Sequence, residues 1–291
     1  MGFVSVKEML ELSNEKQKEI WELVYEDDYN ERNVSRQNSW EKMRGMWYAM
    51  KASSENYDGK IRSHSGLSGG NGLKMREYGE KCISGSFMGS VMAEAISVAE
   101  SNACMKCIVA APTAGSCGVL PAVLIPYVKK YNTEEDKIIK GLYTSAAFGQ
   151  IIAQRAFIAG AAGGCQAEIG SASAMAAAML VYLQGGSGEQ SANAMAFALK
   201  SLLGLVCDPV AGLVEVPCVK RNVIGAVNAV TSADMAMAGI KSVIPPDEVI
   251  DAMREVGLSM PAALRETGEG GLAATPTGVR IAENMPKLGD M

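Results

Sequence analysis

The sequence predicts an all-α fold, a multi-helix domain with glycine-rich connecting loops and few or no strands. The composition is 48% hydrophobic but only 6% aromatic, with 18 Met and 31 Gly in 291 residues. Such a core is built from small and flexible side chains, which suits closely packed helices with Met filling irregular gaps. Helical spacing of apolar residues recurs along the chain, whereas alternating patterns are rare, and Leu213–Val219 is the best short strand candidate.

Two segments are expected within what is one continuous domain overall. Residues 1–60 are charged, contain all three Trp and predict a helical segment that wraps the core. Ser5 and Glu8 have the spacing of a capping box, which marks the start of a helix. Residues 61–291 carry the candidate chemical groups. They open with IRSHSGLSGGNG (61–72), which is too rich in Gly and Ser for a stable helix and predicts an ordered loop.

Beyond residue 73 the chain is rich in Ala, Gly, Met and Val, and glycines and prolines divide it into helical stretches. Gly185 and Gly186 end one stretch, Gly204 ends another, and Pro245 with Pro246 precedes a third. The expected helices span 90–101, 119–131, 133–158, 166–183, 189–203, 222–238, 247–256 and 260–266.

Charge and hydropathy exclude two classes of protein. The net charge of −5 and the absence of a basic stripe argue against a nucleic-acid binder. The longest mostly apolar run, Ile169–Leu183, is shorter than the roughly 20 residues of a membrane span. Lys7, Glu8 and Glu11 interrupt the first apolar positions, so no signal peptide is expected. Seven Cys, an odd number, then favour a reducing cytoplasm over a disulfide framework.

Cys104 and Cys107 have the two-residue gap of zinc knuckles and redox pairs. A zinc site needs a second ligand pair, however, and the only His, His64, lies 40 residues upstream. No βαβ pattern surrounds the pair, which argues against a thioredoxin-like site. We therefore expect Cys104 and Cys107, like Cys82, to be packing residues.

Cys165, Cys207 and Cys218 each fall at a break in helical pattern. Cys165 follows Ala-Ala-Gly-Gly and precedes a helix, Cys207 precedes Asp-Pro, and Cys218 follows Pro217. Cysteines at helix starts gain from the helix dipole, which favours the thiolate. Soft thiolates without His or a carboxylate cluster favour an iron–sulfur centre over zinc. Three thiolates leave one iron of a four-iron cluster open, and an open iron acts as a Lewis acid.

Four segments, in order, resemble the iron–sulfur-dependent L-serine dehydratases. These are NACMKCIVAAPTAGSCGVLPAVL, GGCQAEIGSASAMAAA, LVCDPVAGLVEVPCVKRN and GGLAATPTG, and the resemblance covers roughly residues 60–280. The last segment is similar to the end of the catalytic alpha chain of the two-chain type. The resemblance implies a 4Fe-4S cluster held by Cys165, Cys207 and Cys218, with no pyridoxal phosphate. Single-chain relatives add a removable tail Cys, and this chain has no Cys after Cys218.

The implied reaction is the conversion of L-serine to pyruvate and ammonia, in amino-acid degradation and gluconeogenesis. The open iron would stabilise the departing hydroxyl, and an exposed cluster of this kind is expected to be oxygen-sensitive. The loop at residues 61–72 is similar to the family pattern S-x-S/T-G-L-S/T-G-G, and the turn Ala111–Ser116 to A-P-T-A-G-S. The candidate substrate-binding residues in these two segments are Ser63, Ser65, Gly66, Ser68, Thr113, Gly115 and Ser116.

His64 is the candidate general base, as the only imidazole in the chain. Two alternatives stay open: an exposed loop histidine without a catalytic role, or a base supplied by a beta chain. For the reaction itself, a second hypothesis is the same cluster chemistry on L-cysteine or L-threonine. A non-catalytic redox or regulatory subunit, in which Cys104 and Cys107 form a dithiol, is a third, and an inert helical scaffold a fourth. The expected partners are a small amino-acid substrate and either a beta subunit or further copies of this chain, with no nucleic acid and no membrane.

Overall fold

The structure is a computed structural model that describes residues 2–285, and these contain thirteen α-helices and no strand. The all-α prediction is therefore confirmed. In chain order the helices are α1 (Val6–Lys16), α2 (Ile20–Glu31), α3 (Arg36–Glu55), α4 (Asn71–Tyr78), α5 (Gly85–Ala103), α6 (Val119–Tyr131), α7 (Glu135–Arg155), α8 (Gly160–Gly163), α9 (Ser171–Leu183), α10 (Gly188–Lys200), α11 (Cys218–Met237), α12 (Pro246–Ser259) and α13 (Pro276–Glu283). A π-helical turn, η3 (Gln166–Gly170), leads into α9, and short 3-10 turns are η1 (Gly79–Lys81), η2 (Ala114–Ser116), η4 (Val210–Gly212), η5 (Ala262–Leu264) and η6 (Gly271–Ala274).

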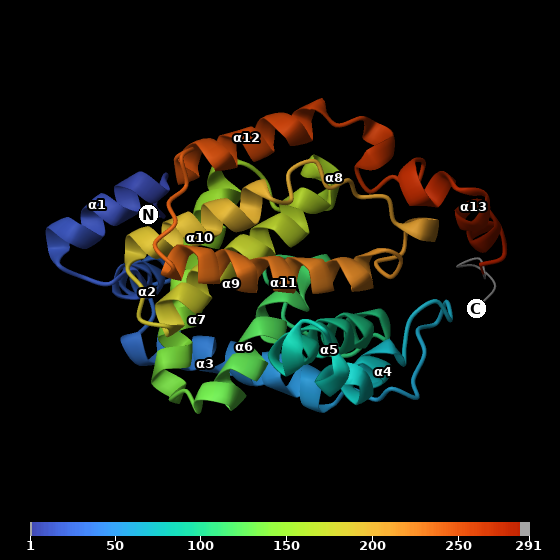
Figure 1. Ribbon diagram of the computed structural model, residues 1–291. Coiled ribbons are helices and arrows are strands. Elements are labelled where there is room, and N and C mark those ends of the chain that lie inside the picture. The colour runs from blue at the N-terminus through green and yellow to red at the C-terminus, as the bar shows by residue number, and fades with distance from the viewer. Residues whose placement is uncertain (1, 286–291) are drawn as a thin grey trace.

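Helix α9 forms the centre of the fold (Figure 1), with α6, α7, α10 and α11 packed around it. Every residue of α9 except Tyr182 is buried. Its sequence, SASAMAAAMLVYL, is small or apolar on all sides, as a helix enclosed by other helices requires. The chain that enters this rigid, buried helix is the segment that contains Cys165, so the central packing fixes one side of the candidate site.

The N-terminal helices are anchored to the core by aromatic side chains. Trp21 and Tyr25 of α2 contact Trp40 of α3 at ring-centroid distances of 6.3 and 5.6 Å, and Tyr25 contacts Tyr143 of α7 at 5.3 Å. Buried residues of α1–α3 belong to the same hydrophobic cluster as those of α5–α7 and α9–α12. The division of the chain near residue 60 stays a prediction.

Most predicted helices lie where the periodicity placed them, and the one predicted at 119–131 has the bounds of α6. The strand candidate at 213–219 is wrong. Its backbone groups bond locally, since Glu215 N–H donates to Leu213 O and Val219 N–H to Glu215 O, and Cys218 already begins α11. The helix expected at 260–266 is only the 3-10 turn η5, because the following backbone turns to pair with Cys207. Helices α4, α8 and α13 were not predicted.

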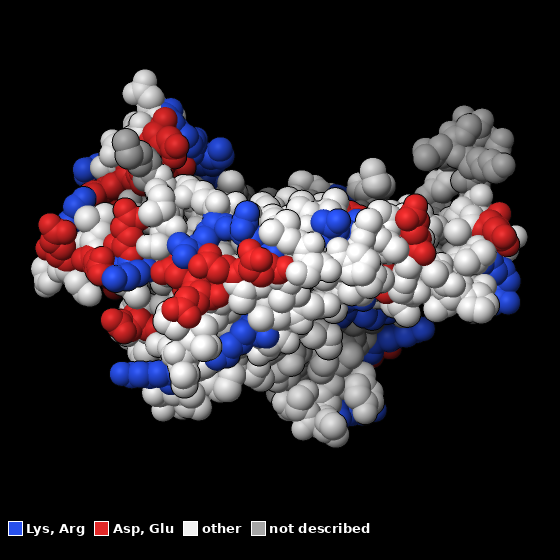
Figure 2. All heavy atoms as spheres, turned by 90° about the horizontal axis from the view of Figure 1, so that it is seen from above, with Lys and Arg blue, Asp and Glu red and all other residues white. Residues whose placement is uncertain are grey.

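The face seen from above in Figure 2 carries acidic and basic side chains next to one another, most densely toward the end where α1 lies. They are interleaved, and the remainder of this face is largely uncharged. Within residues 2–285, no helix combines the length and the apolar character that crossing a membrane requires.

Candidate active site

Three cysteines predicted as metal ligands come together at the N-terminal ends of two helices. Cys165 immediately precedes η3, and Cys218 is the first residue of α11. Cys207 lies between α10 and α11, and its sulfur is within 4.8 Å of the Cys165 sulfur, on which Cys218 also acts. All three are buried. The structure thus brings the three sulfurs together, while their role as ligands stays a prediction.

Gln166 holds the Cys165 turn against the segment that leads to Cys207. Its backbone N–H donates to the carbonyl of Leu205 at 2.9 Å. Its side-chain oxygen accepts from the backbone N–H of Gly204, also at 2.9 Å. Gln166 is fully buried, so both bonds are shielded from water. A buried polar side chain with its partners satisfied fixes one geometry, and here it fixes the approach of two cysteines.

Arg221 of α11 is the cationic side chain beside the sulfurs. Its guanidinium donates to the Cys165 sulfur at 3.4 Å and to the carbonyl of Val206 at 2.7 Å, and it pairs with Asp208 at 2.8 Å. Val206 and Asp208 flank Cys207 in sequence. Arg221 therefore holds the Cys207 backbone on both sides and places positive charge next to the Cys165 sulfur.

The segment after α12 closes the other side of Cys207. The Cys207 N–H donates to Leu264 O at 2.8 Å, and Glu266 N–H donates to Cys207 O at 2.7 Å. Asp208 accepts from the backbone N–H of Leu272 at 2.7 Å. The position of Cys207 is consequently fixed by α11 on one side and by the C-terminal segment on the other.

The three thiols do not ionise alike. The pKa of Cys165 is lowered to about 3, chiefly by hydrogen bonds from Cys207 and Cys218, with Arg221 adding to the effect. The pKa values of Cys207 and Cys218 are raised, first by their hydrogen bonds to the Cys165 sulfur and then by burial. A soft metal that binds all three sulfurs would displace the protons that they carry.

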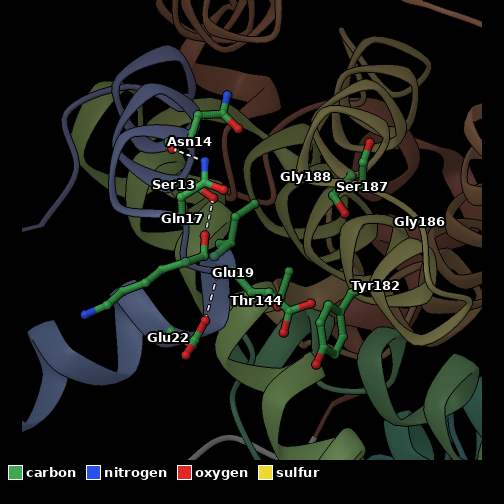
Figure 3. A pocket seen from close by; sticks show the side chains of 13 residues that line it. Ser13, Asn14, Gln17, Glu19, Glu22, Thr144, Tyr182, Gly186, Ser187 and Gly188 are labelled. Carbon is green, nitrogen blue, oxygen red and sulfur yellow. Dashed lines mark hydrogen bonds between the residues drawn. The ribbon is translucent and has the colours of Figure 1, made fainter.

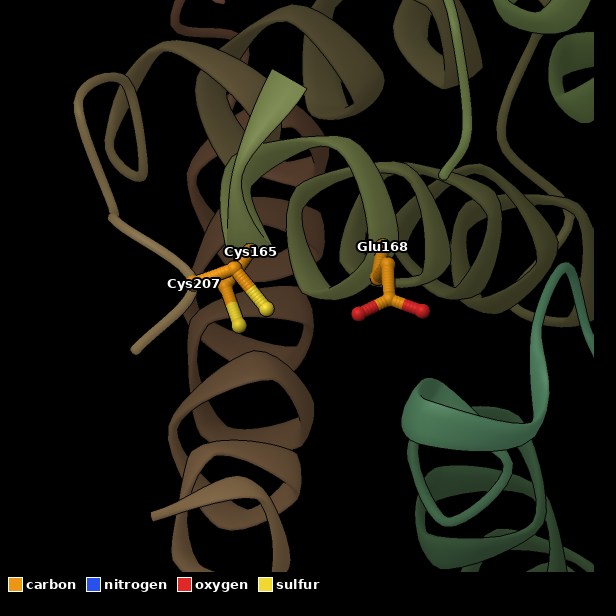
Figure 4. A group of neighbouring side chains, drawn as sticks. All are labelled: Cys165, Glu168 and Cys207. Atoms are coloured by element: carbon orange, nitrogen blue, oxygen red, sulfur yellow. The ribbon is translucent and has the colours of Figure 1, made fainter. Parts of the chain in front are cut away.

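Glu168 completes this group, and it was not predicted from the sequence. Figure 4 shows its carboxylate and the sulfurs of Cys165 and Cys207 projecting to the same side, and the ligand atoms lie within 4.8 Å of one another. The pKa of Glu168 is raised to about 7, chiefly by burial and also by the Cys165 sulfur and Glu266, while a hydrogen bond from Thr113 acts in the opposite sense. The site therefore combines three sulfurs with an inward-facing carboxyl group.

The predicted turn Ala111–Ser116 lies against Glu168. A Cβ added to Gly115 would be 3.0 Å from a Glu168 carboxylate oxygen, so the glycine permits this approach. Asn222 of α11 donates to the carbonyl of Gly115 at 2.8 Å. The Ser116 hydroxyl is fully buried and lies 3.1 Å from that of Thr113, so it is used within the turn. Thr113 and Gly115 thus lie beside Glu168 of the candidate metal group (Cys165, Glu168 and Cys207), and Ser116 shapes the turn.

The predicted serine-rich loop is anchored by Glu215, which the sequence reasoning also missed. Ser63 donates to one Glu215 oxygen at 2.6 Å and Ser65 donates to the other at 2.8 Å. Glu215 is buried and lies three residues before Cys218. These two hydroxyls therefore connect the loop to the segment that carries a cysteine, and both are already engaged.

The remaining loop candidates differ in exposure. Ser68 is 2% exposed, and its hydroxyl has no hydrogen-bond partner among the described residues. Gly66 is exposed with a φ of +76°, which suits glycine. His64 is exposed, and its side chain makes no hydrogen bond or ion pair with any residue in the range 2–285. Nothing in the packing therefore directs His64 toward the sulfurs.

A second buried carboxylate, Glu100 of α5, fixes the end of this loop. It accepts hydrogen bonds from the backbone N–H groups of Gly69, Asn71 and Gly72 at 3.0–3.1 Å and from the Tyr57 hydroxyl at 2.5 Å. Burial raises the pKa of Glu100, but these hydrogen bonds outweigh burial and lower it overall. The prediction of an ordered loop is confirmed for residues 61–70, and α4 begins at Asn71.

Comparison with known proteins identifies the family of the chain. Residues 15–273 match the family model described as serine dehydratase alpha chain. Over 285 residues the chain is 49% identical to "Probable L-serine dehydratase, alpha chain" of Bacillus subtilis (strain 168), covering 97% of this chain and 95% of the relative. The chain belongs to the serine dehydratase alpha chain family.

Two further relatives agree with the family assignment. The chain is 44% identical over 289 residues to "L-serine dehydratase, alpha chain" of Peptoniphilus asaccharolyticus, covering 98% of this chain and 99% of the relative. It is 60% identical over 187 residues to a probable L-serine dehydratase alpha chain of Latilactobacillus sakei, covering 64% of this chain and 90% of the relative. The resemblance seen in four sequence segments is confirmed, and so is the prediction of an enzyme of the dehydratase class.

Cys104 and Cys107 lie outside the group of Cys165, Glu168 and Cys207, the residues that could hold a metal among those the structure describes. The packing interpretation is wrong for Cys107, which is exposed, while Cys104 and Cys82 are only half-buried. Met105 follows the end of α5 with a φ of +58°, and this sharp turn carries the next residues to the surface.

A cavity of about 360 Å³ lies between the N-terminal helices and the α9–α10 connection (Figure 3). Its lining includes Ser13, Lys18, Thr144, Tyr182 and Ser187. None of the predicted site residues lines it. The largely polar cavity is therefore separate from the cysteine group.

Glu168, Glu215 and Arg221 carried a signal that sequence reasoning could have used. Each lies three residues from one of the cysteines, Glu168 after Cys165 and Glu215 and Arg221 on either side of Cys218. Charged residues are rare in these Ala-, Gly- and Val-rich stretches. Burying a charged side chain in such a stretch costs free energy. A charged residue there is therefore a signal of a site.

Proposed function

We propose that the chain catalyses the iron–sulfur-dependent deamination of L-serine to pyruvate and ammonia. The observation that carries the proposal is the convergence of the Cys165, Cys207 and Cys218 sulfurs from three separate segments. It occurs in a member of the serine dehydratase alpha chain family whose relatives are named L-serine dehydratase. The proposal includes no pyridoxal phosphate.

The residues present fit a 4Fe-4S cluster held by these three cysteines. The donors are soft sulfurs, which iron–sulfur centres prefer, and two of them lie at helix N-termini, where the dipole favours the thiolate. Arg221 adds positive charge beside Cys165. When bound, such a cluster supplies a Lewis acid that assists the departure of the serine hydroxyl.

The chain's own part in the reaction is to bind and orient a small amino acid. Thr113 and Gly115 border the metal group through Glu168, so this turn is proposed to contact the substrate directly. Ser63 and Ser65 are engaged by Glu215, and we assign them to positioning the loop. The Ser68 hydroxyl and Gly66 remain candidates for binding the substrate carboxylate. Ser116 supports the turn from inside.

Elimination also needs a base that removes the Cα proton. His64 stays the candidate within this chain because it lies on the serine-rich loop between Ser63 and Ser65. Loss of a general base lowers turnover by about 10²–10⁴-fold. A loss of that size in His64→Ala would support the assignment, whereas unchanged turnover would assign the base to another group, such as one from a beta chain.

The relatives are named alpha chains, and a beta subunit is therefore the proposed protein partner. Assembly of this chain with copies of itself is the second proposal, since small-residue helices suit such packing. The proposed location is the cytoplasm, where the seven unpaired thiols stay reduced. An open iron makes the proposed enzyme oxygen-sensitive.

The test is anaerobic reconstitution followed by measurement of iron, sulfide, visible absorbance and ammonia release. Ala replacement of Cys165, Cys207 or Cys218 is expected to abolish the cluster absorbance and turnover. The matched controls Cys104→Ala and Cys107→Ala are expected to keep both. Loss of the cluster in the control variants and its retention in the first set would overturn the ligand assignment.

The same preparation tests both the substrate preference and the non-catalytic alternative. Ammonia release from L-serine, L-threonine and L-cysteine is compared, and L-serine is expected to be fastest. A cluster that forms but turns over none of the three, with or without a partner chain, would favour a redox or regulatory subunit. A protein that binds no iron would favour a helical scaffold.

A further inference from the structure

Glu168 is a half-buried carboxyl group whose charged neighbours are all negative. The groups that act on it are the Cys165 sulfur and Glu266, together with a hydrogen bond from Thr113. Among the described residues no lysine or arginine pairs with it. Arg221, the cation at the sulfurs, is occupied by Asp208 and Val206 O as well as by Cys165. A carboxylate partly withdrawn from water without a counter-charge costs free energy, and a cation supplied from outside the chain would offset that cost.

The direction of the Glu168 side chain shows where that cation would be. An added Cβ on Gly160 would lie 2.9 Å from a Glu168 oxygen and 3.0 Å from the Cys207 sulfur, so both atoms border the same small space. Figure 4 shows the Glu168 carboxylate facing the same side as the two sulfurs. Its ligand oxygen lies within 4.8 Å of the sulfurs of Cys165 and Cys207. Glycine at position 160 keeps this space free of a side chain.

We propose that Glu168 is a fourth protein ligand of the metal centre in the substrate-free chain, binding through a carboxylate oxygen the iron that the three cysteines leave without a thiolate. This inference rests on the proposed function, since it requires the cluster. The binding is a coordinate bond from a carboxylate lone pair, and any proton on the carboxyl group is released to solvent. Oxygen is a harder donor than sulfur and binds iron less firmly than a thiolate does.

The local backbone supports a ligand role. Cys165 and Glu168 are three residues apart across the π-helical turn η3, which carries both side chains to the same side of the chain. Single π-helical turns inside helices are frequently found at functional sites. On the opposite side Gly115 leaves room for the carboxylate, and Thr113 donates a hydrogen bond that orients it.

The test measures how firmly the fourth iron is held, independently of turnover. Anaerobically reconstituted protein is treated with equimolar ferricyanide and a chelator, and conversion to the three-iron cluster is followed by electron paramagnetic resonance. Glu168→Gln is expected to form a cluster on its three cysteines but to lose the fourth iron roughly tenfold faster or more, because even indirect partners of a metal change its affinity by about that factor.

Glu266→Gln is the matched control, because Glu266 is a neighbouring carboxylate that also approaches the Gly160 space, at 3.2 Å, and is exposed. It removes the same charge from the same region and is expected to lose the iron at the unsubstituted rate. Equal rates for Glu168→Gln and the unsubstituted protein would overturn the inference. Equal acceleration in both variants would also overturn it, by assigning the effect to charge alone.

A second measurement keeps the inference testable if Glu168→Gln does not fold. Unsubstituted protein labelled with ¹³C at the glutamate carboxyl is expected to show a ¹³C hyperfine coupling to the reduced cluster in electron–nuclear double resonance. Absence of that coupling would refute ligation by Glu168. If the unsubstituted protein binds no iron and sulfide at all, the proposed function itself fails, which distinguishes the two failures.

Discussion

Replacing Glu100 by Gln tests whether one buried carboxylate holds the serine-rich loop. The side chain is fully buried, and its two oxygens accept from Gly69, Asn71 and Gly72 N–H groups, from the Asn71 amide at 2.7 Å and from Tyr57. The hydrogen bonds lower its pKa despite burial, so the folded state favours the ionised form. Gln keeps the shape but replaces one acceptor oxygen with a donor.

The magnitude follows from the number of donors that lose an acceptor. In either orientation of the new amide, at least two hydrogen bonds to the former carboxylate are lost or lose their charge. Each bond to a charged group contributes about 1.5–3 kcal/mol, so the free energy of unfolding should fall by about 3–6 kcal/mol. If only the loop opens, the same loss appears as faster amide hydrogen exchange in residues 61–72.

The assays are urea unfolding followed by circular dichroism, and amide hydrogen exchange of the loop. Glu55→Gln is the control, because Glu55 forms an exposed pair with Lys51 at 3.5 Å and should change stability by less than about 0.5 kcal/mol. The stabilisation by Glu100 should also disappear as the pH falls through its lowered folded-state pKa. A change below about 1 kcal/mol in Glu100→Gln, with unchanged loop exchange, would refute the reasoning.

Three further predictions concern the turn and the loop. Gly115→Ala places a Cβ 3.0 Å from a Glu168 oxygen, and should cost about 1–3 kcal/mol by overpacking and reduce serine turnover; unchanged melting and turnover would contradict this. Asn222→Ala removes hydrogen bonds of 2.8 and 2.9 Å to two buried backbone groups, and should lower the free energy of urea unfolding by about 2–4 kcal/mol. A decrease below about 1 kcal/mol would contradict this. Burial, then the Glu100 hydrogen bond, raises the pKa of Tyr57 to about 12, so its stabilising contribution is complete below pH 10 and is lost toward pH 12. The loss of unfolding free energy between pH 10 and 12 should be smaller in Tyr57→Phe than in the unsubstituted protein. Equal losses in the two proteins would contradict this role of Tyr57.

The helices of this protein could be predicted because apolar spacing and breaker residues agree along much of the chain. The bounds of α6 follow from the apolar run between Gly118 and Asn132, and both ends carry residues suited to a terminus. The apparent strand at 213–219 illustrates where local patterns fail. Its alternating Val residues belong to a turn whose hydrogen bonds are local, and no partner strand exists in residues 2–285.

The cysteines of the candidate site could be predicted from sequence, but the carboxylates around them could not. Cys165, Cys207 and Cys218 fall at helix ends, where local signals are strong. Glu168 and Glu215 gain their roles from contacts across the fold, Glu168 with the Thr113 turn and Glu215 with Ser63, which lies 152 residues away. Only the packing of α9 and α11 brings such distant segments together.

The enclosure of α9 has a consequence for how this protein can vary. Twelve of its thirteen residues are buried on every side, and most are Ala or Ser. Almost any larger residue there must displace a neighbouring helix, and the displacement would reach Cys165 at the start of the same continuous helical segment. A saturation-mutagenesis map should therefore show α9 as a nearly invariant stripe inside a tolerant exterior, with losses of function that arise from packing alone.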